Sequence, residues 1–275
     1  MQHSSIRALP VVLAGALILA GPERLVAQDD EERSVVAVLR YDNNTGDGTY
    51  DHLGRALSSM LISDLSAIER IQLVERERLD ELVAELDFQQ SGYVDPESAQ
   101  TVGMIIGAQF VVAGAFVTVD PEMRLDTRIA KVETSEIVTT AEVTGQQESL
   151  FDLQQRLAAE LIQGFELVLT EEEQQRLRER QEANRIDDLE TMVRFSQALC
   201  MMDAGAYVEA GEALQDVQQR APGSALVGAT LALLRDRAED EAEDRLRSEA
   251  NRAIGGLLGR RVNPVPQRTE RTIAC

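Results

Sequence analysis

The sequence predicts an α/β core with a five-stranded mixed sheet flanked by helices, followed by an all-α region of helical hairpins. Two observations predict this fold class: residues 34–169 alternate strand and helix patterns, and residues 170–258 show only helical spacing. With 275 residues, 44% of them hydrophobic, the chain is long enough for one large domain or two small ones. We therefore expect two domains, with a boundary between residues 169 and 170.

The first 27 residues are typical of a secretory signal peptide. Arg7 precedes an apolar stretch over residues 8–21, and Ala27 supplies a small residue at the expected cut. At about 14 residues, this stretch is too short to span a bilayer. No cysteine stands near the cut to be acylated. We expect a soluble protein exported to the periplasm of a Gram-negative-type bacterium, without a transmembrane segment after the signal is removed.

Hydrophobic periodicity defines the elements of the core. Short continuous or alternating apolar runs predict strands at residues 35–39, 71–74, 110–119, 123–132 and 137–143. Apolar residues at three- and four-residue steps predict helices at residues 53–68, 75–86, 95–106 and 150–169. Short polar turns at residues 120–122 and 133–136 join the last three strands as antiparallel neighbours.

The region after residue 170 reads as helical throughout. Thr170, followed by three glutamates, predicts the start of an exposed helix. Further helices are expected within residues 191–222 and 225–234, and residues 259–275 are expected to be a disordered tail. One narrow stripe is expected to pack back on these helices or to recruit a partner helix; it comprises Ala238, Ala242, Leu246, Ala250, Ile254, Leu257 and Leu258.

Composition excludes several classes of function. With 27 Lys and Arg against 48 Asp and Glu, the formal net charge is -21, which opposes binding to nucleic-acid phosphates. The chain has two histidines, His3 and His52, and two cysteines, Cys200 and Cys275, too few for clustered zinc sites. For the cysteines, we expect a buried free thiol at Cys200 and a frayed Cys275, the alternative being a disulfide or a dimer link.

Three features of the sequence are candidates for chemical sites. The loop Asp42–Gly48 resembles a calcium-binding loop, which needs a glycine at its sixth position and a glutamate at its twelfth. Neither of the two ways of aligning this loop with that pattern supplies both residues. Gly48 and Gly54 do not form a phosphate loop, because Arg55 and the next residue replace the required Lys-Ser/Thr. His52, at a helix start, lacks a Ser or Cys partner at a recognisable spacing. We therefore expect no catalytic, cofactor or metal residues.

Several pieces, in order along the chain, resemble one known family. They are residues 36–39 (VAVL), 43–47 (NNTGD), 50–54 (YDHLG), 74–76 (VER), 90–92 (QSG) and 107–114 (GAQFVVAG). Over residues 34–169 the chain resembles the CsgG family, the curli production assembly/transport component, whose core is similar to the N-terminal domain of TolB. The resemblance implies an exported envelope protein with an α/β core and no catalytic site.

The founding curli channel is an outer-membrane lipoprotein ring whose subunits donate long hairpins to a β-barrel. Here the turn at residues 120–122 is short, and the strand from Met123 alternates apolar residues with Arg124, Asp126 and Arg128, a pattern of one core face and one wet face. We therefore expect that the pore function of the family is not carried over.

Residues 191–222 resemble a tetratricopeptide repeat unit, on the pattern Ala198, Gly205, Tyr207, Ala210, Leu214, Val217 and Ala221-Pro222. The alternative is an ordinary helical hairpin capping the core. Because one repeat cannot bury its own faces, flanking helices must complete it.

Together these observations favour a non-enzymatic periplasmic adaptor or assembly accessory that binds envelope proteins or exported peptides, with a homo-oligomer as an open alternative. No partner-binding residue can be named from sequence. The rival hypotheses are a subunit of an outer-membrane curli-type secretion channel and an enzyme of unknown chemistry.

Overall fold

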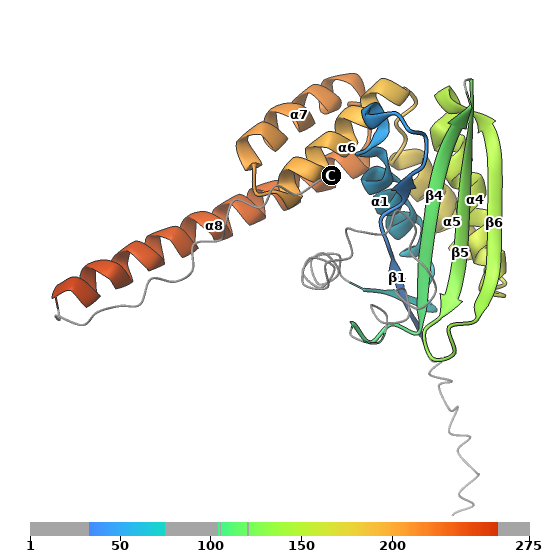
Figure 1. Ribbon diagram of the computed structural model, residues 1–275, viewed down its shortest axis with the longest axis horizontal. Coiled ribbons are helices and arrows are strands. Elements are labelled where there is room, and N and C mark those ends of the chain that lie inside the picture. Colours follow the sequence, from blue (N-terminus) through green and yellow to red (C-terminus); the bar gives the residue numbers. More distant parts are fainter. Residues whose placement is uncertain (1–32, 75–103, 105, 120, 258–275) are drawn as a thin grey trace, which may run out of the picture. The chain divides into compact units, whose positions relative to one another are not determined.

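The computed structural model describes residues 33–74, 104, 106–119 and 121–257. Figure 1 shows the arrangement of a sheet, the helices packed on it and a C-terminal helical region. The α/β elements are β1 (Ser34–Val38), β2 (Asp42–Asn43), α1 (Leu53–Leu65), β3 (Ile71–Leu73), β4 (Phe110–Val119), β5 (Glu122–Lys131), β6 (Ile137–Gln146) and α4 (Leu150–Gly164). The helical elements are α5 (Glu171–Ala183), α6 (Leu189–Asp203), α7 (Tyr207–Arg220) and α8 (Ala225–Leu257).

The sheet is mixed, which confirms the predicted fold class. Its order is β3-β1-β4-β5-β6, with parallel pairing among β3, β1 and β4 and antiparallel pairing from β4 to β6. The sheet has six strands in place of the expected five, because β2 pairs parallel to β4. This extra strand is two residues long, too short to produce an alternating pattern in the sequence.

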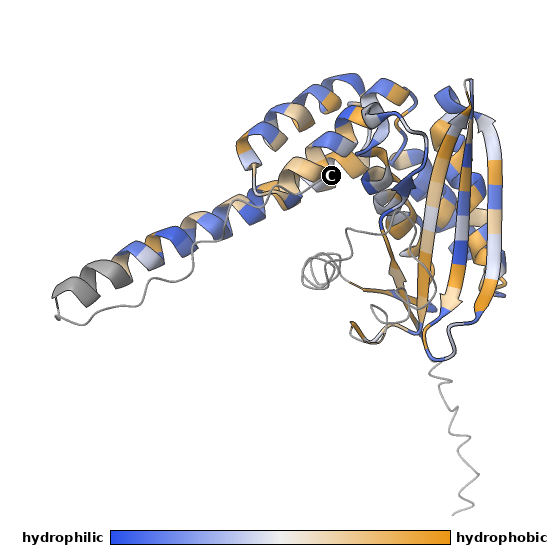
Figure 2. Ribbon diagram, viewed as in Figure 1, coloured by the Kyte–Doolittle hydropathy of each residue, from blue (hydrophilic) through white to orange (hydrophobic). Residues whose placement is uncertain are grey.

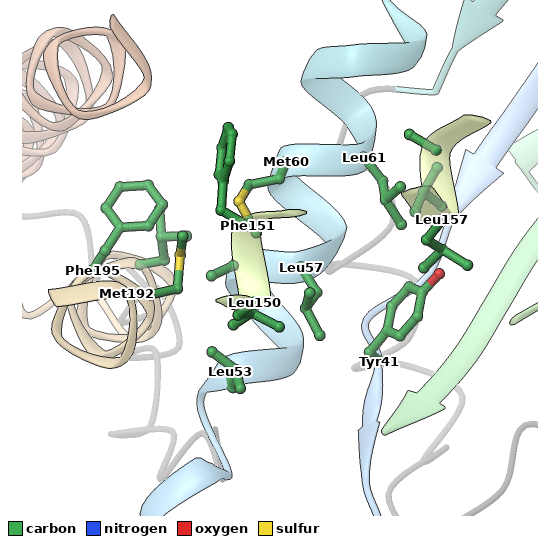
Figure 3. Close-up of a cluster of buried hydrophobic side chains, with 14 of the residues drawn as sticks. Tyr41, Leu53, Leu57, Met60, Leu61, Leu150, Phe151, Leu157, Met192 and Phe195 are labelled. Carbon is green, nitrogen blue, oxygen red and sulfur yellow. The ribbon is translucent and has the colours of Figure 1, made fainter. Parts of the chain in front are cut away.

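One face of the sheet carries the main hydrophobic core beneath α1 and α4. Figure 3 shows Leu57 of α1, Leu150 of α4 and Phe195 of α6 converging in this core. Side chains of α6 and α7 are part of the same cluster as those of the sheet. The helical region therefore shares a continuous core with the α/β elements, while the division at residue 170 stays a prediction about domain organisation.

A smaller cluster lies on the opposite face of β1 and β4. It comprises Ala37, Leu39, Ile106, Ala108, Val111, Ala113 and Val132. Both faces of β1 are thus covered, as the continuous apolar run over residues 35–39 predicted.

The helix α4 ends earlier than its apolar spacing indicated. Helical residues were expected as far as Leu169, but α4 stops at Gly164. Glu166 adopts φ 56°, and the hydrogen bonds from Glu166 N to Gln163 O (2.8 Å) and from Leu167 N to Ile162 O (3.3 Å) close a Schellman motif. The expectation was wrong because this cap places glutamate where glycine is usual, so the sequence carries no stop signal.

The start of α5 is capped as expected. The Thr170 hydroxyl oxygen accepts a hydrogen bond from Glu173 N (3.1 Å), and the Glu173 carboxylate accepts one from Thr170 N (2.9 Å), which completes a capping box. Beyond it, α6 and α7 form a helical hairpin closed by Gly205 at φ 79°. The last helix, α8, is continuous over 33 residues.

Polar contacts tie the helical region to α1. Arg55 of α1 pairs with Asp203 at the end of α6 (2.6 Å), with side chains 5% and 12% exposed, and Arg237 of α8 also approaches Asp203 (3.6 Å). Asp64 accepts hydrogen bonds from Gln154 (2.9 Å) and Gln181 (3.0 Å). These contacts of Arg55 and Asp64 join segments between 90 and 148 residues apart in the sequence.

Several expectations fall outside the described residues: the signal peptide, the helix at 75–86, most of the helix at 95–106 and the tail at 259–275. Met104 and Ile106 are helical, and Gly107 follows with φ 73°. In the part of the chain that the structure describes, no helix combines the length and apolar character needed to cross a membrane.

Candidate functional site

The loop Asp42–Gly48, considered above as a cation site, is a turn held by its own side chains. Asn43 Nδ2 donates to the Asp47 carbonyl (2.9 Å), while Asn43 Oδ1 accepts from Thr45 N (3.0 Å) and Oγ1 (2.7 Å). The hydrogen bond from Thr49 N lowers the pKa of the Asp47 carboxyl below its usual value. Within the described ranges, no group of three or more His, Cys, Asp or Glu side chains is placed to hold a metal ion.

His52 is the N-cap residue of α1, and its ring is not part of a catalytic constellation in the described contacts. Burial lowers the pKa of His52, as does the charge of Arg40, whereas Asp51 raises it. Its Nδ1 is buried without a hydrogen-bond partner among the described residues. The nearby Ser196 hydroxyl donates to the backbone carbonyl of His52 and leaves the ring unactivated. His52 therefore lies at the junction of α1 and α6, with no partner that would make it a general base.

Two glycines in the family-like pieces serve the core. A Cβ on Gly54 would lie 1.8 Å from the Tyr41 carbonyl oxygen, and one on Gly114 would lie 2.3 Å from the Tyr41 ring. Tyr41 is buried, and its hydroxyl shares a 2.6 Å hydrogen bond with Thr127 Oγ1. Gly54 is therefore needed for close packing of α1 and not for a phosphate loop.

The outer face of the meander β4-β5-β6 carries the polar side chains that alternate with the core residues. Figure 2 shows this alternation along β5. Arg124 forms ion pairs with Asp126 (2.7 Å) on its own strand and Glu142 (3.1 Å) on β6. The antiparallel register places Ala115 of β4 beside Asp126, and Asp126 beside Glu142.

The side chains of β4, β5 and β6 leave a shallow hollow on this outer face. Small residues on β4, Ala113 to Ala115, lie beside the longer side chains of β5 and β6, because register sets Ala113 against Arg128 and Arg128 against Thr140. The hollow has a volume of about 320 Å³. Its lining comprises Asp42, Ala113, Gly114, Ala115, Arg124, Asp126, Thr127, Arg128, Ile137, Thr140, Ala141 and Glu142. Opposite charges are mixed along this surface, so it suits a polar partner of moderate charge better than a polyanion.

A second pocket, of about 310 Å³, lies where the loop between α5 and α6 meets the turn between α7 and α8. Its charged side chains are engaged locally: Arg220 pairs with Glu190 (2.8 Å), and Arg185 pairs with Asp187 and lies 5.3 Å over the ring of Phe151. These contacts stabilise the ends of the helices.

The structure overturns one expectation about the cysteines. Cys200, on the buried side of α6, is disulfide-bonded, so the expected free thiol is wrong. The sequence contains one other cysteine, Cys275, which lies outside the described residues. An oxidising compartment permits such a bond, and burial of Cys200 does not by itself distinguish a thiol from a disulfide.

Sequence reasoning named no partner-binding residue, and the outer face supplies candidates. The alternation of Arg124, Asp126 and Arg128 with apolar residues was recognised as a wet face. The small residues of β4 beside them were not predicted. The short turn after Val119 carries the signal that could have found them, because it sets Val119 opposite Glu122. That pair determines the register of the whole hairpin, down to Phe110 opposite Lys131.

The fold and its surfaces define a class: an α/β domain with a mixed sheet, fused to helices and offering shallow polar surfaces. Residues 24–124 match the family model of CsgG, the curli production assembly/transport component. This match confirms the resemblance seen in the ordered sequence pieces. The tetratricopeptide-like character of residues 191–222 stays a prediction.

Comparison with curated proteins finds no significant match. Among solved structures, the chain is similar to the C-terminal domain of LpoB from Escherichia coli, with 19% identity, 44% of this chain and 89% of that chain covered, and a TM-score of 0.36. Lipoprotein GNA1162 from Neisseria meningitidis is 11% identical, with 50% of this chain and 99% of that chain covered and a TM-score of 0.36. The PelC dodecamer from Paraburkholderia phytofirmans is 16% identical, with 49% of this chain and 88% of that chain covered and a TM-score of 0.29. At these identities and TM-scores the likenesses carry no argument about function.

Proposed function

We propose that this protein is a non-enzymatic accessory or adaptor of a bacterial cell envelope, which acts in the periplasm by binding protein partners. The observation that carries the proposal is the match of residues 24–124 to the curli assembly/transport family. The signal-like segment before Ala27 supports export. The family-like glycines support this role indirectly, because their part in the described structure is packing around Tyr41 and not chemistry.

The surface that we assign to the partner is the outer face of β4-β5-β6. Its hollow is bordered by paired side chains of both signs, and the small residues of β4 let a partner approach the backbone. Such an interface gains specificity from hydrogen bonds and shape, with limited help from net charge.

Fractionation tests the location and separates this proposal from the channel hypothesis. We expect osmotic shock of cells expressing the full chain to release a protein whose N-terminus has been cleaved near Ala27. Recovery only from detergent-extracted outer membrane, as a multimeric ring, would contradict an adaptor and support a channel subunit.

Site-specific photocrosslinking tests the surface. A photoreactive residue at Thr140 or Thr144, both on the outer face of β6, should form crosslinks to a defined envelope protein in cells. The same residue at Glu160, exposed on α4, serves as the control. The Ala115→Tyr substitution fills the hollow and should abolish the Thr140 crosslink, while Glu160→Tyr should leave it unchanged. Crosslinks of equal yield from Thr140 and Glu160, unaffected by Ala115→Tyr, would refute the assignment.

A further inference from the structure

The second half of α8 is a helix without a covering partner in the described structure. The first turns of α8 pack through Val227 and Leu234, both buried. From Glu239 to Ala250 nearly every residue is exposed, and Leu246 is 67% exposed. Hydrophilic residues predominate along this part of α8 in Figure 2. The stripe expected to pack back on the hairpin does not do so at Ala242, Leu246 or Ala250.

Apolar residues nevertheless follow one face of this segment. At about 100° per residue, the positions Ala242, Leu246, Ala250, Ala253 and Leu257 fall within an arc of about 80° on the helix surface. Their spacing of four, four, three and four residues is the spacing of a helix–helix seam. Ala238 and Ile254 lie to either side of this arc, so the seam is narrower than the stripe drawn from sequence alone.

The uncovered part of α8 lacks the packing that stabilises most helices. Helical stability in proteins comes mainly from the burial of an apolar face, and the segment beyond Arg237, about 20 residues long, buries little of its own. Its i,i+4 ion pair between Arg245 and Glu241 (2.6 Å) is exposed, and exposed pairs of this kind contribute little to helix stability. Burial of the apolar seam against another helix would supply the missing stabilisation.

The charges of the segment indicate which helix that is. Residues 236–244 contain six acidic residues and one arginine, whereas residues 245–253 contain three arginines and one glutamate. Acidic and basic halves therefore follow each other along one helix. In a parallel pair, like halves would face each other, but in an antiparallel pair each acidic half faces a basic half. A second copy of the same chain is the partner with this complementarity built in.

We propose that the protein forms a homodimer through an antiparallel pair of α8 helices, seamed by Ala242, Leu246 and Ala250 of each copy. The register that sets Leu246 of one copy against Ala242 of the other pairs a large side chain with a small one at the centre of the seam. Asp240 and Arg247 lie on the same flank of the helix. In that register Arg247 of one copy comes within one residue of Asp240 of the second copy.

The first test measures the mass of the full processed chain by sedimentation velocity across a range of micromolar concentrations. We expect a reversible monomer–dimer equilibrium, and Leu246→Asp should raise the dimer dissociation constant by at least about tenfold. Val208→Asp, on α7, is the matched control, because Val208 is also an exposed apolar residue (75%) and lies outside the seam. A wild-type chain that stays monomeric at all concentrations, or equal effects of the two variants, would overturn the proposal.

A charge exchange tests the antiparallel register. Asp240→Arg and Arg247→Asp should each weaken the dimer, because each places like charges on the same flank. The double variant should restore a dissociation constant close to that of the wild type, since both inter-helix pairs between positions 240 and 247 are re-formed with their signs reversed. Additive weakening in the double variant would contradict the antiparallel arrangement.

The cysteines provide a final discrimination. The measurements are repeated with reductant, and the proposed dimer should persist, because its seam contains no cysteine. Loss of the dimer on reduction would show an intermolecular disulfide in place of the α8 seam.

Discussion

Gly54 and Gly114 leave the space that Tyr41 occupies, because neither carries a side chain. Gly54→Ala and Gly114→Ala should each destabilise the protein by about 3 kcal/mol, because the added methyl meets backbone or a buried ring that cannot move away. Gly228→Ala in α8 is the control: nothing lies within 4 Å of its added Cβ, and alanine there should stabilise by about 0.5–1 kcal/mol. Urea unfolding of the three variants measures these differences, and a mild effect at Gly54 would contradict the close approach.

The buried carboxyl of Asp64 determines a pH dependence. Burial raises the pKa of Asp64, and the hydrogen bonds from Gln181 and Gln154 only partly oppose the rise. The folded state therefore holds this proton at higher pH than the unfolded state does. Ionisation of Asp64 lowers the free energy of unfolding as pH rises through the raised pKa, and this loss is absent below the ordinary aspartate pKa near 4.

Asp64→Asn tests this linkage, since asparagine keeps an acceptor for the two glutamines and cannot ionise. The free energy of unfolding of the variant, relative to the wild type, should increase between pH 4 and pH 7. Urea unfolding at both pH values measures the difference. A variant whose relative stability falls with rising pH would show that the ionised carboxylate is favoured in the folded protein.

At the scale of elements, the end of α4 stores strain at Glu166. Its φ of 56° is a left-handed conformation that costs a non-glycine residue on the order of 1 kcal/mol. Glu166→Gly should therefore stabilise the protein by roughly that amount, while Glu160→Gly, within the same helix, should destabilise it by about 1 kcal/mol. Thermal unfolding of both variants gives the comparison. Destabilisation by Glu166→Gly would mean that the glutamate side chain makes a contact worth more than the strain.

Elements with strong local signals were predictable from sequence, and those that depend on distant contacts were not. The β4-β5 hairpin followed from alternation and a short turn, and the helix start at Thr170 followed from four consecutive residues. The bulge between Ile129 and Ala130 and the two-residue strand β2 left no periodic trace. The outer-face hollow required knowing which β4 residues lie beside Arg124 and Arg128, so its polar half was foreseen and its small-residue half was not.

At the scale of the whole molecule, the ion pair between Arg55 and Asp203 joins the sheet-bound helix α1 to the helical hairpin across 148 positions of sequence. No local pattern identifies such a pair. Together with the hydrophobic cluster shared by α1, α4 and α6, it predicts that the α/β elements and the helical hairpin unfold as one cooperative unit.

Asp203→Ala tests this coupling because it leaves the buried Arg55 guanidinium without its carboxylate, a change that costs about 3–5 kcal/mol. Glu190→Ala, which breaks the exposed ion pair with Arg220, should cost at most about 1 kcal/mol. In urea, the Asp203 variant should retain a single transition at a lower midpoint, followed equally by circular dichroism and by a fluorophore placed on α7. Two separated transitions would show that the helical hairpin is an independent domain, and the boundary near residue 170 would then be a boundary in folding as well as in sequence pattern.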